Sequence, residues 1–165
     1  MSKKYDNVYQ ATHDIDWFCR IGNQFVHCAS NGGRLPEKVN DREMNGRNQE
    51  IVAGLKDVVS SDQVIINRGY VYERLGKNES PEAFGRYVSS FVSMAKKGFL
   101  SFDRVEGEDI YRWVAKPNSA IMLDIATLPE YDTRACGDFY RKKEVLHVDC
   151  LDQADRINAI KGSSS

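Results

Sequence analysis

Short runs of aromatic and branched residues, separated by turn residues, predict a β-hairpin near the start of the chain. Residues 16–21 and 24–29 form the two runs, and Gly22-Asn23 links them. Glycine and asparagine both accept the positive φ of a two-residue turn, so this link favours a tight hairpin. The expected register places Cys19 opposite Val26.

Later in the chain, the same pattern predicts a second hairpin and two single strands. The hairpin pairs residues 99–104 with residues 110–115 around an acidic tip. The single strands cover residues 120–126 and 139–149, and the proline, aspartate and glycine between them indicate a loop over 128–138. Because hairpins place their two strands antiparallel, we expect a mainly antiparallel sheet.

Helical periodicity predicts two principal helices, over 41–57 and 81–97, and a short closing helix over 151–160. Residues 63–75 are rich in β-branched and aromatic side chains and are expected to be extended, with a helix over 70–75 as the alternative. In the second principal helix, apolar residues recur at three- and four-residue intervals, and this stripe should face the core. The stripe consists of Phe84, Tyr87, Val88, Phe91 and Ala95.

Together these elements predict an α+β fold, with a mainly antiparallel sheet built from hairpins and packed by the two principal helices. The chain has 165 residues, of which 41% are hydrophobic, and this suits one domain with its own core. We expect a single domain over 11–161, a flexible N-terminus over 1–10 and a flexible tail over 162–165.

Charge and hydropathy argue against some classes of function. The 23 basic and 24 acidic residues give a net charge of −1, which does not favour nucleic acid as a partner. No apolar run approaches the roughly 20 residues that cross a bilayer, and no secretory signal is visible. We therefore expect a cytoplasmic protein that does not associate with membranes, in which the four cysteines are thiols.

Established catalytic motifs are missing, so the candidates for enzyme chemistry are single residues. No P-loop, dinucleotide fingerprint, nucleophile elbow or Cys-x-x-Cys motif occurs. A cysteine beside a cation can serve as a nucleophile when a histidine adjoins it, and an Asp-x-Asp pair can hold Mg²⁺ beside a phosphorylated substrate. The sequence leaves the question of catalysis open. The residues concerned are Cys136, Cys28, His147, His27, Asp14 and Asp16.

The cysteines and histidines are numerous enough for one zinc site, and His147-x-x-Cys150 has a chelating spacing. However, isolated cysteines in apolar stretches are often simply buried. The adjacent residues His27 and Cys28 also point to opposite faces of a strand. We therefore predict neither a bound metal nor a cofactor.

A winged-helix domain that binds nucleic acid is one alternative, because helix 81–97 is followed by hairpin 99–115. The tip of this hairpin is acidic, with Glu106, Glu108 and Asp109, and acidic side chains oppose contact with phosphates. The apolar stripe of the helix is also expected to face the core rather than a groove.

Aromatic residues on the predicted strands favour protein association. Tyr111 and Trp113 share one strand face, and Trp17 lies on the first hairpin. Either helices and loops cover both faces of the sheet, or one face is an exposed aromatic patch of the kind found at interfaces. Our leading hypothesis is a non-catalytic binding or regulatory protein that pairs with a second copy or another protein. An enzyme and a winged-helix protein are the alternatives.

Overall fold

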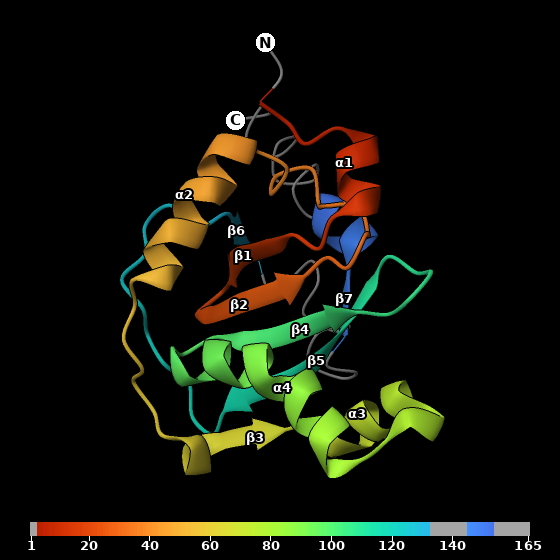
Figure 1. Cartoon of the computed structure of the whole chain (residues 1–165). Helices are drawn as coiled ribbons and strands as arrows, with labels where there is room; N and C mark the ends of the chain where they lie inside the picture. The colour runs from red at the N-terminus through yellow and green to blue at the C-terminus, as the bar shows by residue number, and fades with distance from the viewer. Residues whose placement is uncertain (1–2, 133–144, 154–165) are drawn as a thin grey trace.

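The computed structural model describes residues 3–132 and 145–153, and these form a seven-stranded sheet covered by helices and loops (Figure 1). The strand order is β3-β5-β4-β2-β1-β6, and β7 also pairs with β5. The strands are β1 (Asp16–Ile21), β2 (Gln24–Ala29), β3 (Val64–Ile66), β4 (Leu100–Arg104), β5 (Ile110–Pro117), β6 (Glu130–Tyr131) and β7 (Val145–His147). The helices are α1 (Asn7–Thr12), α2 (Arg42–Ala53), α3 (Arg68–Leu75) and α4 (Pro81–Lys96), with single 3-10 turns η1 (Ser61–Gln63) and η2 (Gly76–Asn78). Residues 148–153 are also helical.

The fold is α+β as predicted, but its sheet is mixed rather than mainly antiparallel. β2 pairs in parallel with β4, and β1 pairs in parallel with β6. After β2 the chain passes through α2, β3, α3 and α4 before it returns as β4, and a crossover of this kind places two neighbouring strands parallel. Hairpin signals could not predict this because they report only pairs of strands that follow one another in the sequence.

Local signals correctly predicted the first hairpin and the helix α4. β1 and β2 pair antiparallel, with Cys19 opposite Val26. The side chain of Ser80 accepts a hydrogen bond from the Ala83 backbone at the start of α4. At its end, Gly98 has a φ of 107°. A Cβ atom there would lie 2.9 Å from the Ile121 side chain, so glycine is required both by the backbone conformation and by space.

The apolar stripe of α4 packs against one face of the sheet, which we call the helical face (Figure 1). Val88, Phe91 and Ala95 are buried there beside Val114 of β5. α2 reaches the same face at β1, where its Val52 joins a second apolar cluster. This cluster also contains Phe18, Phe25 and Phe99. The stripe is thus shielded from water, as the periodicity predicted.

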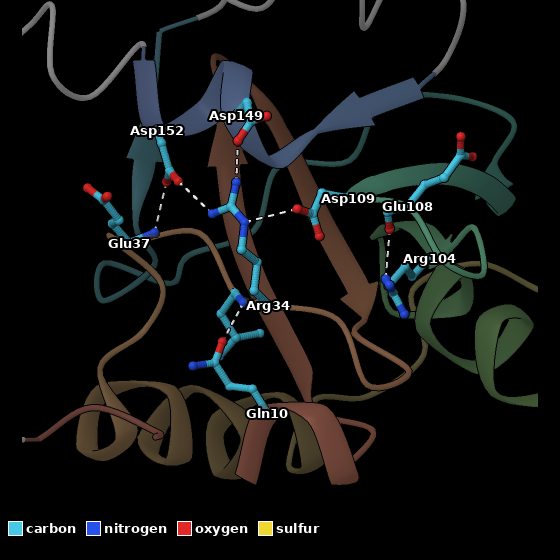
Figure 2. A network of polar contacts seen from close by, with 9 residues as sticks. Gln10, Arg34, Glu37, Arg104, Glu108, Asp109, Asp149 and Asp152 are labelled. Carbon is cyan, nitrogen blue, oxygen red and sulfur yellow. Dashed lines mark hydrogen bonds and ion pairs between the residues drawn. The ribbon is translucent and has the colours of Figure 1, made fainter. Parts of the chain in front are cut away.

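Shorter segments cover the opposite face, where Trp17 and Tyr111 are buried. Arg34 ties these segments together (Figure 2). Its Nε donates to Asp109 Oδ2 at 3.0 Å, its Nη1 donates to Asp152 Oδ2 at 3.0 Å, and its Nη2 donates to Asp149. The loop after β2, the turn before β5 and the helical residues 148–153 are therefore held to one guanidinium group, and we call this arrangement the Arg34 clasp.

Residues 63–75 are only partly extended, because β3 ends at Ile66 and α3 begins at Arg68. The side chain of Asn67 accepts a hydrogen bond from the Tyr70 backbone, so it caps the new helix. Tyr70 and Val71 are then buried on one helical side. The alternative of a helix over 70–75 was correct, because capping and burial outweighed the high β-propensity of these side chains.

Two further expectations differ from the structure. Residues 120–126 form no strand, although Ile125 is buried and Leu123 packs beside it. The apolar side chains of this segment pack against the core, but its backbone is not paired with a neighbouring strand. The expected flexible N-terminus instead contains α1, with Tyr5 and Gln10 buried. The segment 154–165, with most of the expected closing helix and the tail over 162–165, lies outside the described residues.

Candidate functional site

A pocket of about 440 Å³ opens between α1, the start of β1 and the second half of α2. We call it the α1–α2 pocket. It combines aromatic and aliphatic side chains with carboxyl, amide and imidazole groups. Its lining residues are Tyr5, Tyr9, His13, Asp14, Ile15, Asp16, Phe18, Gln49, Val52, Ala53 and Met94. The pocket thus brings together Asp14 and Asp16, which the sequence indicated, with residues that it did not.

Side chains of α2 hold the beginning of β1 in place at this pocket. The parallel partner of β1, β6, pairs only with Arg20 and Ile21. At the other end of the strand, Asn45 Nδ2 and Gln49 Nε2 donate to the Asp16 carbonyl oxygen at 3.1 and 2.8 Å. Two amide side chains one helical turn apart therefore satisfy a strand carbonyl at the sheet edge.

The two carboxyl groups of the pocket are fixed by different partners. Asp14 Oδ1 accepts from the Asn31 backbone N–H at 2.9 Å. Asp16 Oδ1 accepts from His27 Nε2 at 2.8 Å. The Asp16 side chain is 51% exposed, so its carboxylate remains accessible although it is hydrogen-bonded to the buried His27 ring.

Asp16, His27 and Ser101 form a hydrogen-bonded row across β1, β2 and β4. His27 Nδ1 lies 2.6 Å from Ser101 Oγ. A carboxylate only accepts hydrogen bonds, so Nε2 carries a proton, and in the neutral ring Nδ1 accepts from the serine hydroxyl. The groups match those of a hydrolytic triad, but Ser101 is completely buried and does not line the pocket. A substrate carbonyl cannot reach this hydroxyl, so the row is structural in this conformation.

Replacing Ser101 with alanine should lower the free energy of unfolding by about 1–2 kcal/mol, because His27 Nδ1 loses its buried partner. Urea denaturation measures the change. Ser93→Ala removes an exposed hydroxyl from α4 and serves as the control, with an expected effect within about 0.5 kcal/mol. If the two variants are equally stable, the hydrogen bond to His27 contributes nothing to the fold.

An aromatic stack forms the α1 side of the pocket. The ring centroids of Tyr5 and Tyr9 are 5.3 Å apart, and those of Tyr9 and His13 are 3.7 Å apart. The guanidinium of Arg42 lies 5.8 Å from the Tyr5 ring centroid and 5.3 Å from that of Tyr9. The four-residue spacing of these rings, together with Asp6 as an N-cap, is a helix signal that the sequence analysis missed.

A second polar cluster lies further along β4, away from the pocket. Asp103 Oδ2 accepts from Tyr87 Oη at 2.6 Å and forms an ion pair with Arg74, whose Nε lies 3.2 Å away. Burial raises the pKa of the Asp103 carboxyl, although these two partners act in the opposite direction. Burial and the neighbouring Asp103 also raise the pKa of Tyr87. Because Tyr87 of α4 and Arg74 of α3 both contact the Asp103 carboxylate of β4, this cluster links the two helices to the sheet.

The cysteine candidates do not form a catalytic arrangement within the described residues. Cys28 is fully buried, and burial raises the pKa of its thiol, which opposes thiolate formation. His147 lies half-buried on β7, opposite Ile110 of β5. Cys136 lies outside the described ranges. Over residues 3–132 and 145–153, no three His, Cys, Asp or Glu side chains are grouped in a way that could hold a metal ion.

The proposed aromatic interface is also not formed as predicted. Trp17 is 0% exposed and Tyr111 is 1% exposed, so both belong to the core. The indole Nε1 of Trp17 donates to Tyr111 Oη at 3.2 Å, and the two rings meet edge to face. Trp113 is half-buried, and Lys116 lies over its ring at 4.3 Å. Loops and helical residues 148–153 cover this face, as the alternative in the sequence analysis supposed.

The winged-helix alternative would require the hairpin of β4 and β5 to project from the fold as a wing, and it does not. β4 and β5 lie inside the sheet, where β4 pairs with β2 and β5 pairs with β3 and β7. The apolar stripe of α4 faces the core.

None of the described helices is both long and apolar enough to span a bilayer.

Exposed polar groups, aromatic rings and an open volume coincide at the α1–α2 pocket. Comparisons with protein-family models, with curated proteins and with solved structures find no match for the chain. Its function must accordingly be inferred from the geometry of this site.

Proposed function

We propose that this chain is a non-catalytic binding protein whose ligand occupies the α1–α2 pocket. The observation that carries the proposal is the pocket itself, with a volume of about 440 Å³. Pockets for small ligands typically measure about 300–1,000 Å³ and combine an apolar lining with a few polar groups. Phe18, Val52 and Met94 supply the apolar part, and Asp14 and Asp16 supply polar groups.

The positions of two candidate nucleophiles favour a binding role over a catalytic one. Ser101 and Cys28 are both completely buried, and neither lines the pocket. Asp14 and Asp16 do line it, but within the described part of the chain no third metal ligand joins them. Within the described part of the chain, a ligand that enters the pocket therefore meets carboxylates that can hold it, and neither the Ser101 hydroxyl nor the Cys28 thiol can reach it.

Filling the pocket with a large side chain tests the proposal. Ala53 is exposed at the end of α2 and lines the pocket, so Ala53→Trp should obstruct it without disturbing the core. Glu50→Trp places the same side chain on the same helix, outside the lining, and is the matched control. Ligand-observed NMR with a fragment library containing cationic, neutral and anionic members would compare the two variants with the wild type.

We expect fragments that bind the wild type and Glu50→Trp and bind Ala53→Trp at least about 10-fold more weakly, because a tryptophan side chain excludes a ligand of similar size. Circular dichroism and thermal melts check that both variants fold. Hits that bind all three proteins equally, or a library without hits, would refute a binding role for this pocket.

A further inference from the structure

We infer that the ligand of the α1–α2 pocket presents an organic cation, such as an amidinium, a guanidinium or a primary ammonium group. The inference rests on the proposed function and adds the chemical class of the ligand. It follows from three features of the pocket: the hydrogen-bonding groups that it offers, its charge and its aromatic wall.

The polar groups of the pocket are mainly hydrogen-bond acceptors. The carboxylates of Asp14 and Asp16 only accept hydrogen bonds. Oδ1 of Asp14 accepts from the Asn31 N–H, and Oδ1 of Asp16 accepts from His27 Nε2. Gln49 donates one N–H of its Nε2 group to the Asp16 carbonyl, and its Oε1 adds an acceptor. A ligand that satisfies these groups must donate hydrogen bonds.

His13 adds a further acceptor to the same pocket. Its Nδ1 lies 2.9 Å from the Tyr9 carbonyl oxygen. A carbonyl oxygen only accepts, so Nδ1 must carry the proton. In the neutral ring Nε2 is then an acceptor, and it adds to the acceptors of the two aspartates.

The carboxylates of the pocket are not paired with the cations that contact its lining. The lining residues include neither lysine nor arginine. Arg42 lies over the Tyr5 and Tyr9 rings, and Lys97 Nζ donates to the carbonyl oxygens of Val52 and Ala53. Among the described residues, no Lys or Arg side chain forms an ion pair with Asp14 or Asp16. Two carboxylates beside a partly apolar cavity attract a cation more strongly than the same groups do in open solvent.

The aromatic wall favours an organic cation over a metal ion. The guanidinium of Arg42 lies within 6 Å of the stacked Tyr5 and Tyr9 ring centroids, so this stack already pairs with a planar cation at one place. Within the described residues, no group of three His, Cys, Asp or Glu side chains is placed to hold a metal ion, so a metal here would depend on water or on the ligand itself for most of its coordination. A flat cation with several N–H donors fits both the aromatic and the carboxylate side of the pocket.

Three probes of similar shape but different charge separate the effect of charge on affinity from the effect of shape. They are benzamidinium, neutral benzamide and anionic benzoate. Titration of the intact chain, followed through the methyl signals of Met94 and Ala53, gives a Kd for each probe. We expect benzamidinium to bind at least about 10-fold more tightly than benzamide, because charge-assisted hydrogen bonds are stronger, and benzoate not to shift these signals. The affinity for benzamidinium should also fall as the salt concentration rises.

Charge-neutral variants locate the interaction. Asp16→Asn keeps an oxygen that accepts from His27 and removes the charge, so the Kd for benzamidinium should rise by about 5–10-fold. Asp14→Asn should have a smaller effect in the same direction. Glu50→Gln removes a carboxylate from α2 outside the lining and should leave the Kd unchanged.

The outcomes distinguish the two proposals. If benzamide or benzoate binds as tightly as benzamidinium, or if Asp16→Asn binds it like the wild type, the pocket binds ligands but the cationic class is wrong. If no probe shifts the Met94 and Ala53 signals and the fragment library also gives no pocket ligand, the binding function is refuted and this inference fails with it.

Discussion

Replacing Arg34 with leucine should lower the free energy of unfolding by about 2–4 kcal/mol, because a buried carboxylate loses its cation. Asp152 has only 5% of its side chain exposed and depends on Arg34 Nη1 and the Glu37 backbone N–H. Without the guanidinium, the Asp152 charge is left in a poorly solvated place. Urea denaturation, followed by circular dichroism, measures the loss.

The effect should depend on the shape of the side chain as well as on its charge. Arg34 uses Nε, Nη1 and Nη2 for different carboxylates, and this fork spans Asp109, Asp149 and Asp152 (Figure 2). A lysine offers one compact ammonium group and cannot reproduce the fork. Arg34→Lys should therefore recover less than half of the lost stability.

Arg20→Leu is the matched control for the Arg34 clasp. Arg20 forms an ion pair with Glu130 at 2.5 Å, but 59% of the Glu130 side chain is exposed. Pairs of this kind contribute about 1 kcal/mol or less, since water solvates both partners once they separate. Equal losses for Arg34→Leu and Arg20→Leu would show that the clasp is only a surface ion pair.

The parts of the fold that were predicted from the sequence depend on contacts close in sequence. Gly22-Asn23 fixes the first hairpin, and Ser80 with the stripe to Ala95 fixes α4, because turns, caps and helical periodicity are encoded within a few residues. The parallel pairing of β2 with β4 joins segments separated by three helices, and local patterns do not report it. The segment of α3 was expected to be extended because its side chains have high β-propensity. In the fold, the cap at Asn67 and the burial of Tyr70 and Val71 outweigh that local preference.

The site was predicted less well than the fold, for the same reason. Asp14 and Asp16 were singled out from the sequence as weak candidates for enzyme chemistry, and the structure places both in the lining of the α1–α2 pocket, but the sequence could not show which other groups surround them. His27 was considered as a catalytic base, whereas its partner Ser101 lies 74 residues further along the chain. Only the folded sheet shows that His27 orients Asp16 and is itself closed off from substrate.

Replacing Trp17 with alanine should lower the free energy of unfolding by about 3–5 kcal/mol, without changing the molecular mass in solution. Trp17 is fully buried, so its removal leaves a cavity in the core. It also leaves Tyr111 Oη, which is buried, without the indole donor. If Trp17 instead formed an interface between copies, the variant would remain stable and change its oligomeric state. Urea denaturation and light scattering separate these two results.

Trp113→Ala is the matched control, because Trp113 lies on the same sheet face as Tyr111 but is only half-buried. Its loss should cost about 1–2 kcal/mol, in proportion to the smaller area that it shields from water. Trp17→Phe adds a second comparison, since it keeps most of the volume and removes the donor to Tyr111, and it should be intermediate. A Trp17→Ala protein as stable as Trp113→Ala would contradict the burial of Trp17, and with it the assignment of this face to the core rather than to a partner.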